Sequence, residues 1–185
     1  MIRKRKGDNK MDNKTNIPKF KYHPNIETDD IVIYDEGICQ CCNKKVNAYI
    51  EHIYSPTDVD CICLDCVKDG SAAKKFNGCF NQYAEKVSDP EKTDELFHRT
   101  PGYLGWQFEY WLACCDDYCA YLGRVGIKEL DELGITEEVL EEYSKRKDAY
   151  PIEDVKEYMD KDGDMSGYLF KCLHCNKYHL WVDAN

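Results

Sequence analysis

Cys39-Gln40-Cys41-Cys42 and Cys63-Leu64-Asp65-Cys66 are the two stretches that decide how this chain folds. Twenty residues separate the two Cys-x2-Cys pairs, a spacing typical of a four-cysteine zinc site. Each pair can turn sharply and present two thiolates to one point, so two pairs complete a tetrahedron. Free or disulfide-bonded cysteines are the alternative. The spacing predicts Cys39, Cys42, Cys63 and Cys66 as the ligands of a first zinc ion, with Cys41 and Cys61 as neighbours that could replace one of them.

The composition indicates one modest domain in a reducing compartment. Hydrophobic residues make up 43% of the 185 residues, enough for one core or two small ones. No apolar run approaches the ~20 residues that span a bilayer. Twelve cysteines without an export signal favour the cytoplasm, where thiolates meet zinc more often than each other. An exported disulfide scaffold is the alternative, which the length of the chain disfavours.

The charge is unevenly spread along the chain. Residues 1–21 hold eight Lys or Arg against two Asp, a net of +6, whereas the other residues carry −16. The acidic body would repel a phosphate backbone, so we do not expect nucleic acid as a partner. The acidic body instead favours a protein partner with basic character. Residues 1–19 are polar and basic and are predicted to form a disordered tail ahead of a single domain at 20–185.

Periodicity and turn signals predict a mixture of strands and helices. Asp89-Pro90 marks a helix start, because Asp89 can cap the helix and Pro90 fits its first turn. Leu104, Phe108 and Trp111 begin an apolar stripe at spacings of three or four, which predicts a long helix over 103–122. The remaining expected elements are short strands near 31–34 and 46–54, a helix from 90 to about 98, and acidic helices near 127–133, 136–147 and 151–159.

The C-terminal part carries half of another metal site. Cys172-Leu173-His174-Cys175 lies between two apolar stretches that indicate strand, knuckle, strand. Cys115 and Cys119 are four apart on the expected helix, so their sulfurs would share one face. The sequence thus predicts a second zinc held by Cys115, Cys119, Cys172 and Cys175. Buried thiols beside a metal-free hairpin are the alternative.

These predictions define an α+β fold class. We expect an N-terminal zinc-ribbon-like β element packed on a helical region, followed by a C-terminal zinc-knuckle β-hairpin. Two zinc ions would then staple two parts of one domain, 20–80 and 103–185.

A calcium site is a weaker interpretation of one turn. Asp160-Lys161-Asp162-Gly163-Asp164 looks like the start of a calcium-binding loop. Its glycine is not in the sixth position, and Lys171 occupies the twelfth, where such loops need a bidentate glutamate. We therefore expect a polar turn before the hairpin.

The chain resembles the CbrC-like family, bacterial proteins named for a colicin-tolerance phenotype. The resemblance covers about residues 19–182 and implies the extent of the domain and a bacterial source, but no mechanism. Cys63-Leu64-Asp65-Cys66 departs from the usual Cys-Pro-Trp-Cys, and Cys114 stands where the family pattern has a histidine, which argues against a role for that position. The matching stretches are 20–24, 63–66, 69–73, 99–102, 106–115, 119–123 and 168–175.

Three functions fit these residues. The first is a zinc-stabilised binding module, since closed four-thiolate sites leave no open position for catalysis. The second is an enzyme whose phosphate- or nucleobase-containing ligand lies near Arg99, Trp106 and Gln107, with His23 nearby; the alternative is that Arg99 pairs with an acid and the other two pack on a zinc knuckle. The third is thiol redox chemistry at Cys63 and Cys66.

Overall fold

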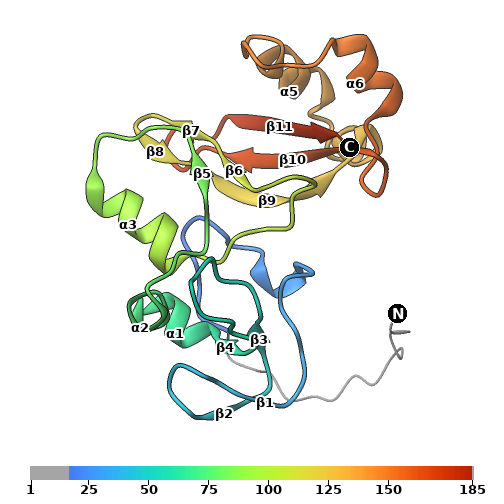
Figure 1. Cartoon of the computed structure of the whole chain (residues 1–185). Helices are drawn as coiled ribbons and strands as arrows, with labels where there is room; N and C mark the ends of the chain where they lie inside the picture. The colour runs from blue at the N-terminus through green and yellow to red at the C-terminus, as the bar shows by residue number, and fades with distance from the viewer. Residues whose placement is uncertain (1–16, 185) are drawn as a thin grey trace.

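A computed structural model describes residues 17–184 (Figure 1). Most of the expected tail, residues 1–16, lies outside this range. Ile17 is buried in the N-terminal core, so the packed region includes a residue that was expected in the tail.

The fold is α+β, as the sequence predicted, with small sheets and six α-helices in the described range. A short 3-10 helix, η1, spans Ile26–Thr28. The α-helices are α1 (Leu64–Lys68), α2 (Ser71–Phe76), α3 (Pro90–Arg99), α4 (Ile127–Leu133), α5 (Thr136–Tyr143) and α6 (Ile152–Tyr158). The strands are β1 (Gly37–Ile38), β2 (Lys45–Val46), β3 (Tyr49–Ile50), β4 (Ile62–Cys63), β5 (Tyr83–Ala84), β6 (Tyr110–Trp111), β7 (Ala113–Cys114), β8 (Asp117–Tyr118), β9 (Ala120–Val125), β10 (Met165–Lys171) and β11 (Tyr178–Ala184).

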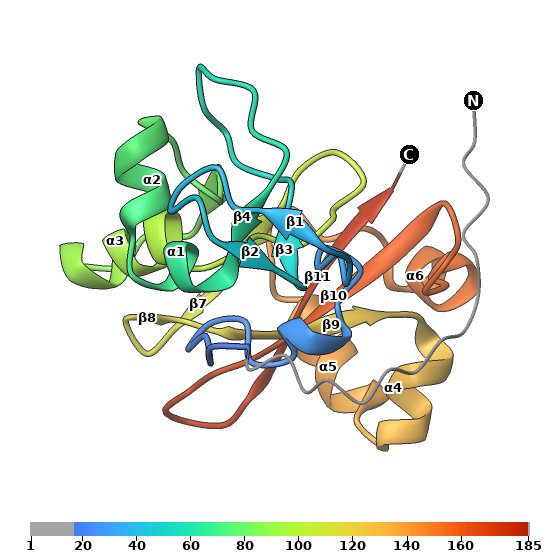
Figure 2. The same ribbon diagram turned by 90° about the horizontal axis from the view of Figure 1, so that it is seen from below.

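The largest sheet is antiparallel and has the order β11-β10-β9. Helices α4, α5 and α6 gather along this sheet (Figures 1 and 2). Leu130, Leu140 and Val155 from these helices are buried with Leu169 and Leu180 from the sheet. The apolar faces of the acidic helices pack into this C-terminal core, while their charged residues stay in water.

A cluster rich in aromatic rings joins the sheet to the middle of the chain. The Tyr103 and Tyr121 rings stack with their centroids 4.3 Å apart, and Trp111 and Phe170 pack edge-on at 5.7 Å. Asn81 is fully buried and accepts a hydrogen bond from Trp111 Nε1 at 2.6 Å. These contacts fix the segment that carries β6 to β8 against β9 and β10.

The N-terminal half has little regular structure of its own. Its β1–β2 and β3–β4 hairpins pair only two residues per strand. The strand expected near 31–34 is a single bridge from Ile33 to Tyr49, and the one expected over 46–54 is broken into β2 and β3. Such short pairings are weak alone, so this half depends on its apolar cluster and on the cysteines described below.

The helix predicted over 103–122 is wrong. That segment forms β6, β7, β8 and the start of β9. Cys115 and Asp116 both have φ of 55°, the conformation of a two-residue hairpin turn, which no helix can pass through. The apolar spacing does not mark one buried face, because Trp111 and Cys119 are buried whereas Leu104 and Cys115 are exposed. Pairing with β10 satisfies the backbone of β9.

The other helix predictions hold more closely. Asp89 accepts a hydrogen bond from Glu91 N at 2.9 Å and Pro90 opens α3, as the cap signals indicated. Helix α4 has the predicted bounds. Helix α5 ends at Tyr143 rather than near 147.

Candidate metal centres

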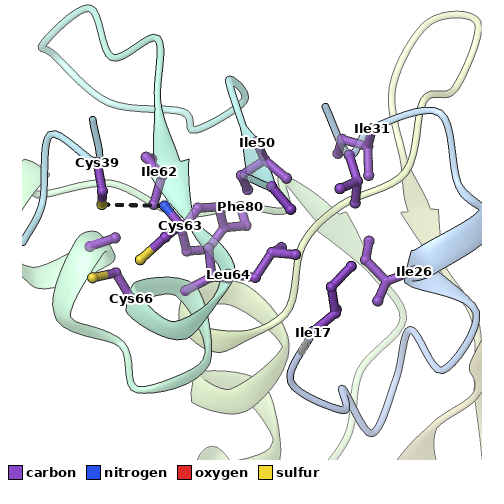
Figure 3. Packing of buried hydrophobic residues seen from close by; sticks show 14 of the residues in the cluster. Ile17, Ile26, Ile31, Cys39, Ile50, Ile62, Cys63, Leu64, Cys66 and Phe80 are labelled. Atoms are coloured by element: carbon purple, nitrogen blue, oxygen red, sulfur yellow. Dashed lines mark hydrogen bonds between the residues drawn. The ribbon is translucent and has the colours of Figure 1, made fainter. Parts of the chain in front are cut away.

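Four cysteines from distant positions meet in the N-terminal half. Cys39 follows β1, Cys42 lies in the next turn, Cys63 ends β4 and Cys66 lies in α1. Their sulfurs all lie within 4.8 Å of one another, with Cys42 Sγ 3.9 Å from Cys63 Sγ. Figure 3 shows the sulfurs of Cys39, Cys63 and Cys66 turned toward one another beside Leu64. These four residues, here the N-terminal cysteine set, are the ones whose spacing indicated a first metal site.

A tight turn aims the first two thiols. Cys39 N donates to Lys44 O at 2.9 Å, and Asn43 N donates to Cys39 O at 2.8 Å. Asn43 has φ of 59°, which asparagine tolerates better than most residues. Across the site, Cys63 N donates to Cys39 Sγ at 3.3 Å. Backbone hydrogen bonds thus fix the first turn and the position of the Cys39 sulfur.

The turn between β10 and β11 repeats this design. Cys172 N donates to Lys177 O at 2.8 Å, and Asn176 has φ of 61°. Both turns read Cys-x2-Cys-Asn-Lys. The shared Asn-Lys is a sequence signal, beyond the recurring cysteines, for the same backbone turn. His174 N and Cys175 N each donate to Cys172 Sγ at 3.4 Å.

The other half of this second group comes from the β7–β8 hairpin. Cys114 Sγ lies 3.7 Å from Cys115 Sγ and 3.6 Å from Cys175 Sγ. Together with Cys172 these residues form the C-terminal cysteine set, whose sulfurs all lie within 4.8 Å of one another.

Cys114, and not Cys119, completes this set, which corrects the assignment from helical spacing. Cys119 is fully buried between β8 and β9, and its backbone N–H donates to Leu112 O at 2.9 Å. The i, i+4 rule brings sulfurs together only on a helix, and the segment is a hairpin. One signal could have found Cys114: the resemblance implied a histidine at that position, and histidine is also a zinc ligand.

The protonation of each set favours a cation. Burial opposes ionisation of Cys39, but N–H groups of Cys63, Cys42 and Cys41 outweigh it and lower its pKa to about 7. Burial is likewise outweighed at Cys172, where N–H groups of Cys175 and His174 lower the pKa to about 6.

The partner thiols shift the other way. Burial raises the pKa of Cys63 to about 12 and raises the pKa of Cys66 and Cys114 as well. Each set therefore readily ionises one sulfur and resists further negative charge. A divalent or softer cation at the centre would remove that conflict, because thiolates prefer zinc, copper(I) or iron.

One buried carboxylate ties the C-terminal set to the start of the chain. Asp117, 2% exposed, accepts hydrogen bonds from Tyr22 Oη at 2.8 Å, Lys21 Nζ at 3.0 Å and His174 Nε2 at 2.9 Å. Burial would raise the pKa of Asp117, but these donors outweigh it and lower the pKa to about 2. No sequence motif predicted this anchor, because its partners lie up to 96 residues away.

The remaining cysteines near the N-terminal set lie outside it. Cys41 Sγ lies 3.5 Å from Ser71 Oγ, and Cys61 is half-buried with a pKa raised by burial. Neither is among the four sulfurs within 4.8 Å of one another.

The four residues considered for a phosphate or nucleobase ligand are spread over separate places. Arg99 Nε donates to Asp94 at 3.0 Å and lines one hollow, whereas buried His23 lines another. Trp106 Nε1 donates to Gly163 O at 3.2 Å, and Gln107 N donates to Asp183 at 2.9 Å. The two are thus held against the C-terminal sheet and the turn before β10.

The fold and these two sets define a class: a small α+β protein with two four-cysteine groups that could each hold a metal ion. The chain belongs to the uncharacterised protein family UPF0167, which it matches over residues 17–184. It is 33% identical over 175 residues to the UPF0167 proteins of Mycobacterium bovis and Mycobacterium tuberculosis, covering 90% of this chain and 93% of theirs. A Pseudomonas aeruginosa member is 32% identical over 176 residues, covering 90% and 97%.

Two further findings concern solved structures and membrane helices. No solved structure matches this chain. Within residues 17–184, none of the helices is long and apolar enough to cross a membrane.

Proposed function

We propose that the chain is a non-catalytic binding module whose two cysteine sets each hold a structural zinc ion. The observation that carries this is the pair of four-sulfur groups, each gathered from two turns that are far apart in the sequence. Four thiolates complete a tetrahedral zinc and leave no position for water, so the metal supplies folding energy and no Lewis acid.

The zinc ions would hold together segments that the two-residue strand pairings are too short to hold. The N-terminal ion joins the turn after β1 to β4 and α1, and the C-terminal ion joins the β7–β8 hairpin to the β10–β11 hairpin. The two stapled parts correspond to 20–80 and 103–185 within one domain. A structural zinc contributes on the order of 10 kcal/mol to folding at neutral pH, as much as the whole net stability of a typical domain.

The partner we propose is a protein with basic character, bound in the cytoplasm of a bacterial cell. The support is the net charge of −16 outside residues 1–21, which disfavours nucleic acid. The resemblance to the CbrC-like proteins agrees with this source. The enzyme alternative, a phosphate- or nucleobase-containing ligand near Arg99, Trp106 and Gln107, is less favoured, because Arg99 and His23 line different hollows.

Zinc content and thiol protection test the proposal together. Native mass spectrometry of the chain should give two zinc ions. A thiol reagent under native conditions should then modify at most the four cysteines outside the sets: Cys41, Cys61, Cys79 and Cys119. Eight reactive thiols and no metal would refute the structural-zinc proposal, and reversible Cys63–Cys66 disulfide formation would favour the redox alternative.

A further inference from the structure

A small hollow lies along the edge of β9 that does not pair with β10, away from both cysteine sets. Its walls come from four segments: η1 and the residues around it, Leu104 in the loop before β6, strand β9, and the turn at 160–163 that precedes β10. The volume is about 220 Å³, the space of about seven water molecules. That is below the range of drug-sized pockets and suits a metabolite of roughly ten non-hydrogen atoms.

Strand β9 is irregular where it borders the hollow. The pairing with β10 shifts between Leu169 and Phe170, so Leu122 is an extra residue in β9. Gly123 follows with φ of +136°, and a Cβ there would meet no atom within 4 Å. Bulges of this kind recur beside binding sites, because they end regular pairing and re-aim side chains. The bulge also frees Leu122 O, which accepts a hydrogen bond from Asn25 Nδ2 at 2.9 Å.

Two cations line the hollow without a carboxylate partner in residues 17–184. Arg124 donates one hydrogen bond, to Leu104 O at 2.8 Å, and its guanidinium lies 5.7 Å from the Tyr168 ring. Lys161 forms no ion pair within that range either. A guanidinium with unused N–H donors is the side chain best suited to grip a carboxylate or phosphate in a bidentate way.

Carboxylates line the same hollow. Asp29, Asp30 and Asp162 are all in its wall, and the last two form no ion pair within the described residues. Asp29 differs from the other two because it has a partner: its Oδ2 lies 3.2 Å from His23 Nε2. The cations Arg124 and Lys161 and the acids Asp30 and Asp162 therefore remain without a counter-charge.

Two simpler ligands match this wall less well. The three aspartates do not bring their oxygens within 4.8 Å of one another, as a shared metal ion would require. A plain anion such as phosphate would face as many carboxylates as cations. A ligand that carries one positive and one negative group can pair with both kinds of charge in the wall. Its remaining atoms can pack on the apolar surface of Leu104, Tyr121 and Leu122.

We propose that this hollow binds a small zwitterion of the α-amino acid type, with its carboxylate on Arg124 and its ammonium group on Asp30 or Asp162. The site is independent of the metal and goes beyond the proposed structural role of zinc. The module would then sense or carry a small metabolite.

Thermal unfolding of the full zinc-loaded chain tests the proposal. Each proteinogenic α-amino acid would be added separately, with acetate, methylamine and inorganic phosphate as partial probes. A ligand at ~100 times its Kd should raise Tm by about 5–10 °C. At least one α-amino acid should do so, and its decarboxylated amine and its hydroxy-acid analogue should not.

Variants localise the effect. Arg124→Gln and the double change Asp30→Asn with Asp162→Asn should each abolish the ligand-induced rise. The exposed matched changes Lys147→Gln and Asp58→Asn should keep it. The readout is the shift on adding ligand, so a lower starting Tm in Arg124→Gln does not affect it, and Asp30 and Asp162 make no side-chain ion pair whose loss would unfold the chain.

Three results would overturn the proposal: no α-amino acid raises Tm, acetate or phosphate raises it as much as an amino acid does, or the rise survives in both pocket variants.

Discussion

The assignment of Cys114 to the C-terminal cysteine set makes the sharpest prediction. Changing Cys114 to serine removes a sulfur that lies 3.7 Å from Cys115 Sγ and 3.6 Å from Cys175 Sγ. A structural zinc binds with about 10–16 kcal/mol, so an equal share per thiolate is about 2.5–4 kcal/mol. At 1.4 kcal/mol for each tenfold change, the affinity of this site should fall by about 10²–10³.

Cys119→Ala is the matched control. Cys119 is fully buried but lies outside both sets, so its loss should cost about 1 kcal/mol of stability without loss of metal. Native mass spectrometry after a fixed chelator challenge reads out both variants. Cys114→Ser should retain one zinc ion and Cys119→Ala two. The reverse pattern would refute the geometry and restore the assignment from helical spacing.

Three further predictions concern the fold. Asn81→Leu should lower the free energy of unfolding by about 3 kcal/mol or more in urea, because it removes the partners of Leu96 O, Thr100 O and Trp111 Nε1; a loss below 1 kcal/mol would contradict the network. Asp89→Ala should cost about 1 kcal/mol by uncapping α3, and Asp89→Asn much less. Burial lowers the pKa of His179, so the unfolded chain takes up a proton first as pH falls through about 6.5, and stability should drop from pH 7.5 to 5.5. His179→Gln should flatten that slope, and an unchanged slope would show that His179 is not its source.

Local rules sufficed wherever a feature depends on nearby residues. Cys39-x2-Cys42 and Cys63-x2-Cys66 indicate a shared site because each pair is a self-contained turn. Asp89-Pro90 marks the start of α3 because a cap acts within one helical turn. Helix α4 was placed at 127–133 from its local pattern, and it has these bounds.

The sequence by itself therefore determined the α+β class, the two cysteine turns and the acidic helices. Only the tertiary structure decided that 103–122 is a set of strands, that Cys114 replaces Cys119, and that Asp117 joins Lys21 to His174. The apolar spacing of 103–122 was misleading, because Leu104 and Cys115 belong to the stripe and yet are exposed, whereas the consecutive residues 117–121 are all buried. The choice depends on β10, some fifty residues later, which pairs with β9 and supplies the backbone hydrogen bonds that a helix would have made internally.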